Sequence, residues 1–136
     1  MNKEFNETDT IETIKNGVER VQKELLRQMD SRLSYVYGDR DRLSRLNNIK
    51  KRKNKLVMEY GQVLDSIEIV CETSKSYINN ALKPIYVIIE KGVITPDDTT
   101  YFNNELRQIE AYIKLSCRKI NTYMRRINEI KHEFHT

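Results

Sequence analysis

Apolar residues recur three and four positions apart over two long stretches of the chain. The first stretch comprises Val57, Tyr60, Leu64, Ile67, Cys71, Ile78, Ala81 and Ile85, with Ser74 as its single polar position. The second follows Gly92 and comprises Phe102, Leu106, Ile109, Ile113, Cys117, Ile120, Met124 and Ile127. This spacing places each set on one face of an α-helix and leaves the opposite face polar. The pattern therefore predicts an antiparallel helical hairpin whose two apolar faces pack together.

A third periodic segment precedes this hairpin. Its apolar positions are Ile11, Ile14, Val18, Val21, Leu25, Met29, Leu33 and Val36. Thr8 or Asp9 is a candidate N-cap, with Glu12 at capping-box distance. Gly17 weakens the helix by about 1 kcal/mol relative to Ala but does not end it. We therefore expect an additional N-terminal helix.

The joint between the first two helices is predicted at Gly38. Gly38 suits a C-terminal cap and Asp39 suits the next N-cap, so the first helix would fold back into a three-helix bundle. This turn would place Val18 near Tyr60. In the alternative, the helix runs straight through Gly38 as part of a coiled-coil-like rod, because the apolar stripe keeps its phase there. We expect the turn, since a continuous helix has little reason to keep a Gly beside an Asp.

The region around and after Pro84 is apolar on every side. Pro84 lacks a backbone N–H and clashes with the preceding turn, so it predicts a kink or a short restart of the second helix. The residues that follow include Ile85, Tyr86, Ile88, Ile89, Val93 and Ile94. One helix cannot bury all of them, so they form either a buried elbow between two helices or a partner-binding tip. Their β-branched side chains also leave a short strand open.

The third helix has a clear N-terminal signal. Thr95 is an N-cap, Pro96 takes the first helical position, and Asp97 and Asp98 lie near the positive end of the helix dipole. The chain is thus predicted to be one all-α domain, an elongated antiparallel helical hairpin plus an N-terminal helix. Its expected helices cover about 9–37, 39–91 and 96–134 of residues 1–136.

The composition agrees with long amphipathic helices. Hydrophobic residues make up 38% and charged residues 32% of the chain, with four Gly and two Pro. An all-β fold would need more turn residues. No apolar run approaches the roughly 20 residues that cross a bilayer, and the N-terminus shows no secretory signal. We expect a cytoplasmic protein without a membrane span, with export by a non-classical secretion system left open.

Positive charge concentrates between residues 38 and 56, where eight Lys or Arg residues stand against two Asp. A hairpin that turns near Ile94 brings the end of the third helix beside this segment. The candidate anion-binding residues are Arg45, Lys50, Lys51, Arg52, Lys53, Lys55, Arg125, Arg126 and Lys131. This basic end predicts either binding of nucleic-acid backbone, an acidic protein or an anionic membrane surface, or only a solvated helix face. Without a base-reading motif, nucleic-acid binding would be insensitive to sequence.

Chemistry-bearing residues are few. The same hairpin places Cys71 level with Cys117, and the two thiols either fill the core as small apolar groups or form a disulfide clamp. Neither has a neighbouring His or a CxxC partner. Glu129 and His132 form one Glu-x-x-His pair, whereas a carboxylate metal site in a bundle needs two. The sequence assigns no catalytic residue, no cofactor and no metal.

The expected function therefore depends on surfaces. The pattern predicts a non-enzymatic helical protein–protein interaction module, such as an adaptor, an assembly factor or a secretion partner. Its partner would be another protein or a second copy in a homo-oligomer, because a thin bundle with an apolar tip gains stability by burying that tip. The alternative is a sequence-nonspecific nucleic-acid-binding accessory protein that uses the basic end.

Overall fold

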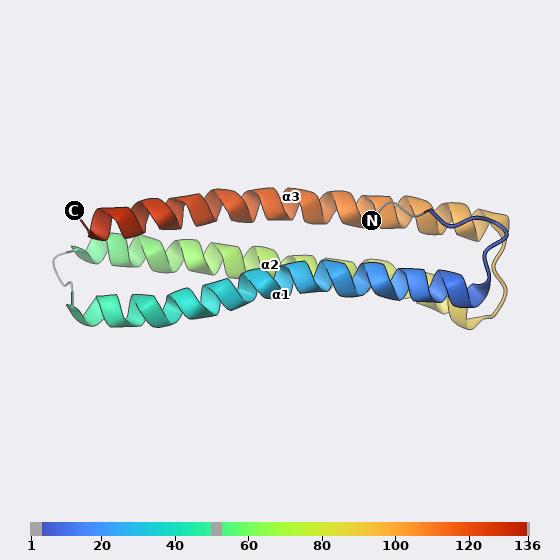
Figure 1. The fold of residues 1–136 in the computed structure, drawn as a ribbon, viewed down its shortest axis with the longest axis horizontal. Helices are drawn as coiled ribbons and strands as arrows, with labels where there is room; N and C mark the ends of the chain where they lie inside the picture. Colours follow the sequence, from blue (N-terminus) through green and yellow to red (C-terminus); the bar gives the residue numbers. More distant parts are fainter. Residues whose placement is uncertain (1–3, 50–52, 136) are drawn as a thin grey trace.

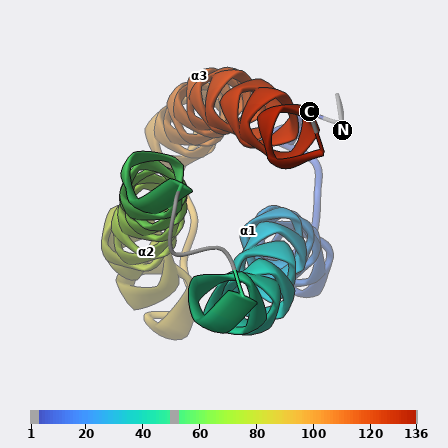
Figure 2. The same ribbon diagram turned by 90° about the vertical axis from the view of Figure 1, so that its left-hand side faces the viewer.

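The computed structural model describes residues 4–49 and 53–135, and within these ranges it consists of long α-helices without strands. The helices are α1 (Ile11–Ile49), α2 (Asn54–Glu90) and α3 (Pro96–Phe134), as Figure 1 shows. Each is about 55 to 60 Å long at 1.5 Å per residue. Seen from the end, the three helices surround one shared core (Figure 2). The predicted all-α helical bundle is confirmed.

The first joint of the bundle is not at Gly38. Helix α1 continues through Gly38 to Ile49, and the chain reverses before Asn54. The predicted turn is wrong: Gly38 lies within α1 on an open side of the helix, with no side chain near the space a Cβ would take. The alternative is correct in that the helix runs straight through Gly38, but it does not continue into α2, which returns along α1. Val18 consequently does not pair with Tyr60; the hydroxyl of Tyr60 donates instead to Asp39.

The N-terminal segment packs across α1 and α3. Thr10, rather than Thr8 or Asp9, caps α1, because its Oγ1 accepts from the backbone N–H of Thr13 at 3.1 Å. Ahead of this cap, the ring of Phe5 is buried against Gly17, and a Cβ on that glycine would lie 2.6 Å from the ring. The side chain of Asn103 on α3 bonds both the N–H and the carbonyl of Phe5. Gly17 therefore makes room for this segment.

Helices α2 and α3 pair in the register that the two apolar stripes predict. Ser74 donates to Ser116 at 3.0 Å in the buried interface, which satisfies the one polar position of the α2 stripe. The rings of Tyr77 and Tyr112 stack nearby, with their centroids 4.0 Å apart. These two contacts join α2 to α3 near the middle of both helices.

The connection between α2 and α3 turns at Gly92, but the helix before it is not interrupted at Pro84. Helix α2 continues through Pro84 to Glu90, so the predicted restart is wrong; Leu82 and Ile85, on either side of Pro84, are fully buried and hold the helix in place. Gly92 then turns the chain with a φ of 77°, a conformation that glycine adopts readily.

The start of α3 is as predicted. Thr95 accepts from the N–H of Asp98 at 3.2 Å, and the Asp98 carboxylate accepts from the N–H of Thr95 at 2.9 Å. Pro96 occupies the first turn, where its missing N–H costs nothing. This capping box confirms the predicted N-terminus.

Candidate protein-interaction surfaces

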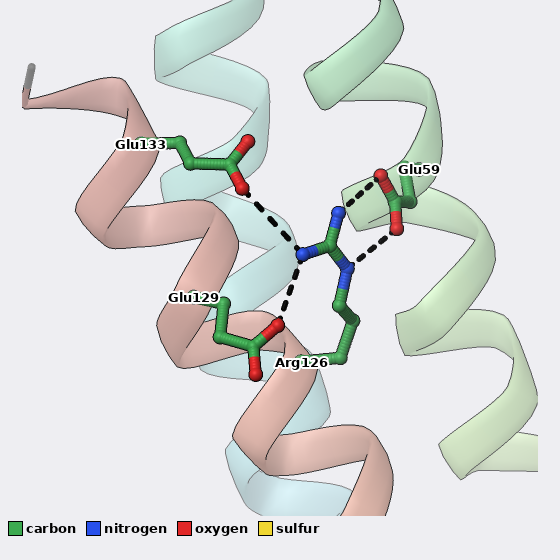
Figure 3. A network of polar contacts seen from close by, with 4 residues as sticks. All are labelled: Glu59, Arg126, Glu129 and Glu133. Carbon is green, nitrogen blue, oxygen red and sulfur yellow. Dashed lines mark hydrogen bonds and ion pairs between the residues drawn. The ribbon is translucent and has the colours of Figure 1, made fainter.

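At the basic end of the bundle, several of the candidate cations are paired with carboxylates of the same chain. Arg126 of α3 lies between helices, and its guanidinium donates to both carboxylate oxygens of Glu59 on α2, at 2.6 and 2.8 Å (Figure 3). It also pairs with Glu129 at 3.0 Å and Glu133 at 3.6 Å on its own helix. The hydrogen bond from Arg126 lowers the pKa of Glu59, and Glu59 in turn raises that of Arg126. Arg126 therefore joins α2 to α3.

A second cation of this end is held by a buried carboxylate. Lys131 of α3 lies 2.9 Å from Asp39 of α1 and 5.4 Å from the centre of the Tyr35 ring. Asp39 also accepts from the hydroxyl of Tyr60 on α2 at 2.7 Å, so one carboxylate connects all three helices. Burial, followed by the charge of Asp39, raises the pKa of Tyr35 to about 12. The predicted N-cap role of Asp39 is thus wrong.

The remaining candidate cations divide into three groups. Lys53 donates to the backbone carbonyl of Glu133 at 2.7 Å and therefore closes the end of α3. Arg45, Lys55 and Arg125 are exposed. Lys50, Lys51 and Arg52 lie outside the described residues. The structure thus brings the predicted basic residues of α2 and α3 to one end, but three of the six that it describes are engaged within the bundle.

The apolar tip is largely buried. Ile85 and Ile89 are 0% and 6% exposed, and Tyr86, Ile88 and Ile94 are partly buried against the core. Tyr86 also donates to Gln22 of α1 at 2.6 Å. Of the predicted tip residues, Val93 is the exposed one, at 71%. The tip is therefore mostly an elbow of the core.

The two cysteines are free thiols inside the bundle. Cys71 is fully buried, and this burial raises its pKa to about 11. Cys117 is partly buried and its sulfur contacts the side-chain oxygen of Gln28 on α1 at 3.8 Å. Both side chains thus belong to the interior between the helices.

An exposed groove lies on the outer side of α2 and α3, near the middle of both helices. Its volume is about 330 Å³, and its lining is mostly apolar. Ile69 of α2 and Leu115 of α3 line it and are 65% and 62% exposed. The other lining residues are Val70, Thr73, Tyr112, Ser116 and Lys119. Two large aliphatic side chains are therefore exposed to water at this one groove.

The groove belongs to a longer surface that we call the uncharged face. On α2 it follows the spacing of the core residues, displaced by two positions, so that it points outward. Its members on α2 are Gln62, Ser66, Ile69, Thr73, Ser76, Asn80, Pro84 and Val87, and on α3 they are Tyr101, Asn104, Gln108, Ala111 and Leu115. None of these members carries a charge, in a chain with 32% charged residues, although Lys119 of the groove and the half-buried Glu105 of α3 lie beside them.

The opposite side of the bundle differs. On α1, the exposed positions include Glu19, Lys23 and Arg27. Ion pairs also line the α1–α2 seam, where Arg40 bonds both Asp65 and Glu68, at 2.8 and 2.6 Å. The uncharged face is therefore a property of one side of the molecule. Sequence reasoning missed it, although the seven-residue spacing of Gln62, Ile69 and Ser76 carries the signal.

Further features of the described residues bear on the kind of site. Among residues 4–49 and 53–135, no group of three or more His, Cys, Asp or Glu side chains is placed to hold a metal ion. In the same part of the chain, no helix has the length and apolar character required to span a membrane. No family model, no curated protein and no solved structure matches the chain.

Proposed function

We propose that the chain is a non-enzymatic helical protein–protein interaction module, serving as an adaptor, an assembly factor or a secretion partner. The observation that supports this proposal is the uncharged face, with Ile69 and Leu115 at its groove. Exposure of these two side chains to water costs free energy that a partner would recover, at about 25 cal/mol for each Å² of apolar surface buried. Depletion of charge is also the composition that distinguishes the centres of protein interfaces.

The groove suits a helical partner. It is lined by side chains of both α2 and α3, and a further helix, from a partner, can pack into such a groove by placing its own apolar residues there. Thr73 and Lys119, which are exposed lining residues, supply hydrogen-bonding groups beside the apolar centre. A partner helix with apolar residues three and four positions apart would satisfy both parts.

The basic end supports the nucleic-acid alternative less well. Arg126, Lys131 and Lys53 would have to leave Glu59, Asp39 and a backbone carbonyl, respectively, before they could bind phosphate. Each of these contacts joins two helices, so binding would weaken the bundle. Salt separates the two functions, because affinity for phosphates falls steeply with ionic strength whereas affinity through an apolar groove changes little.

Photo-crosslinking in cells of the native source tests the proposal. A photoreactive amino acid in place of Leu115 should form adducts with a protein, whereas the same photoreactive amino acid in place of Tyr37 should not. Tyr37 is a matched control, because it is 52% exposed and lies on α1, away from the uncharged face. Equal adducts from both positions, or none from Leu115, would contradict the proposal.

A further inference from the structure

We propose that the partner on the uncharged face is a second copy of this chain, docked antiparallel about a twofold axis near Gln108. This inference rests on the proposed function and names its partner. It follows from the order of apolar, polar and charged residues along α3, which is self-complementary about that residue. In such a twofold dimer the same surface is used by both copies.

The apolar residues pair first. Leu115 lies seven residues after Gln108, and Tyr101 lies seven residues before it. Antiparallel α3 helices therefore place Leu115 of each copy against Tyr101 of the other, twice per dimer. Both side chains are exposed in the single chain, at 62% and 37%. Gln108 meets itself at the axis, where two amides can exchange hydrogen bonds.

The same twofold axis also places α2 of one copy against α2 of the other. Because Tyr77 stacks on Tyr112, the level of Gln108 on α2 is close to Asn80. Ile69 then faces the end of α2 in the second copy, where Val87 and Val93 are 52% and 71% exposed. The dimer would thus cover five exposed hydrophobic residues of each copy: Ile69, Val87, Val93, Tyr101 and Leu115.

Charge complementarity favours this antiparallel alignment of the two α3 helices over a parallel one. The α3 residues of the uncharged face are followed by Lys119, eleven residues after Gln108, and preceded by Asp97, eleven residues before it. Both are exposed, and neither forms an ion pair among residues 4–49 and 53–135. In the antiparallel dimer, Lys119 of each copy meets Asp97 of the other. A parallel dimer would instead place like charges together.

The available area suffices for a specific but not a tight dimer. From Asp97 to Lys119 the face is about 33 Å long at 1.5 Å per residue, and two helices make it about 18 Å wide. Each copy would bury about 600 Å², and the total of about 1,200 Å² lies at the lower limit of specific interfaces. We therefore expect an equilibrium between monomer and dimer that responds to protein concentration.

Sedimentation equilibrium of the purified full chain over a range of concentrations tests this dimer. We expect dimerisation in the wild type, weakened at least tenfold by Leu115→Glu and unchanged by the control Tyr37→Glu. Lys119→Asp and Asp97→Lys should each weaken it, and the double variant should restore it, which a purely structural role of either residue would not produce. Circular dichroism confirms that each variant is folded.

The crosslinking residue at Leu115 separates this inference from the function on which it rests. In purified protein, an adduct of twice the chain mass, mapped to the segment around Tyr101, supports the dimer. A wild type that stays monomeric, or a double variant that fails to regain dimerisation, overturns it. If Leu115 then crosslinks to a different protein in cells, the dimer is wrong and the interaction module stands. If it crosslinks in neither setting, both proposals fail.

Discussion

Replacement of Asp39 by Ala tests whether one buried carboxylate holds the three helices together at the basic end. Asp39 is 7% exposed and accepts from the hydroxyl of Tyr60 at 2.7 Å and from the ammonium of Lys131 at 2.9 Å. The substitution leaves the hydroxyl of Tyr60, which is fully buried, without this acceptor. It also leaves Lys131 without its nearest opposite charge. Both consequences destabilise the folded state.

The magnitude follows from these two losses. A buried hydroxyl without a partner costs about 1–3 kcal/mol. Loss of one partner from a fully buried ion pair costs about 3–5 kcal/mol, but the side chain of Lys131 is 21% exposed, so we assign about 1–2 kcal/mol to it. The free energy of unfolding should therefore fall by about 3–4 kcal/mol. For a chain of 136 residues this corresponds to a melting temperature lower by about 10 °C.

Thermal and urea unfolding followed by circular dichroism measure this loss. The matched control is Asp41→Ala, two residues along the same helix and exposed. Both substitutions gain the same helix propensity, so propensity cancels in the comparison. Asp41→Ala should change the stability by less than about 0.5 kcal/mol. Equal effects of the two substitutions would refute the proposed role of Asp39.

A double-mutant cycle with Tyr60→Phe measures the hydrogen bond itself. Tyr60→Phe should destabilise the wild type but have little further effect after Asp39→Ala, since its acceptor is already gone. We expect a coupling energy of about 1 kcal/mol or more between the two positions. Strictly additive effects would show that Tyr60 and Asp39 act independently.

Four other substitutions follow from the structure. Gly17→Ala should destabilise the protein by about 1–3 kcal/mol in urea unfolding, because its Cβ would meet the ring of Phe5. Gly38→Ala should instead stabilise it by up to about 1 kcal/mol, since helix propensity acts there without a clash; the same sign at both glycines would contradict this account. Leu64→Asp should cost several kcal/mol, because a carboxylate would replace a fully buried side chain without a partner; retention of the wild-type melting temperature would count against the core position of Leu64. The folded state raises the pKa of Tyr35 from 10.0 to about 12, so its contribution to stability is complete below pH 10 and lost as the pH rises through about 12. Unfolding free energies across this range should fall less steeply for Tyr35→Phe than for the wild type, and identical slopes would exclude the effect.

Local signals predicted much of this fold. The capping box at Thr95 depends on residues within one helical turn, so sequence inspection alone could identify it. The register of α2 on α3 was also predictable, because two apolar stripes of similar length separated by a short connection can pair in one way. The contacts of Ser74 with Ser116 and of Tyr77 with Tyr112 lie within about one turn of the predicted level.

The first joint was not predictable from local preference. A glycine followed by an aspartate favours a turn, whereas the apolar stripe that keeps its phase across Gly38 favours a continuous helix, and local preference does not decide between these two signals. Helix α1 nevertheless continues, because Asp39 becomes the buried acceptor for two residues that lie 21 and 92 positions further along the chain. A contact with such partners exists only after α2 and α3 have packed.

The candidate surfaces also divide into features that the sequence predicts and features that only long-range contacts decide. The sequence by itself determined that the chain is helical, that three amphipathic stripes need one another, and that Lys and Arg gather at one end. Only the tertiary structure decided which cations are engaged, since Arg126 and Lys131 meet their carboxylates across helix interfaces. It also decided that α2 and α3 together present an uncharged face. The physical reason is range: periodicity and caps act within a turn of helix, whereas the neutralisation of a charge and the exposure of a side chain depend on residues that folding brings together.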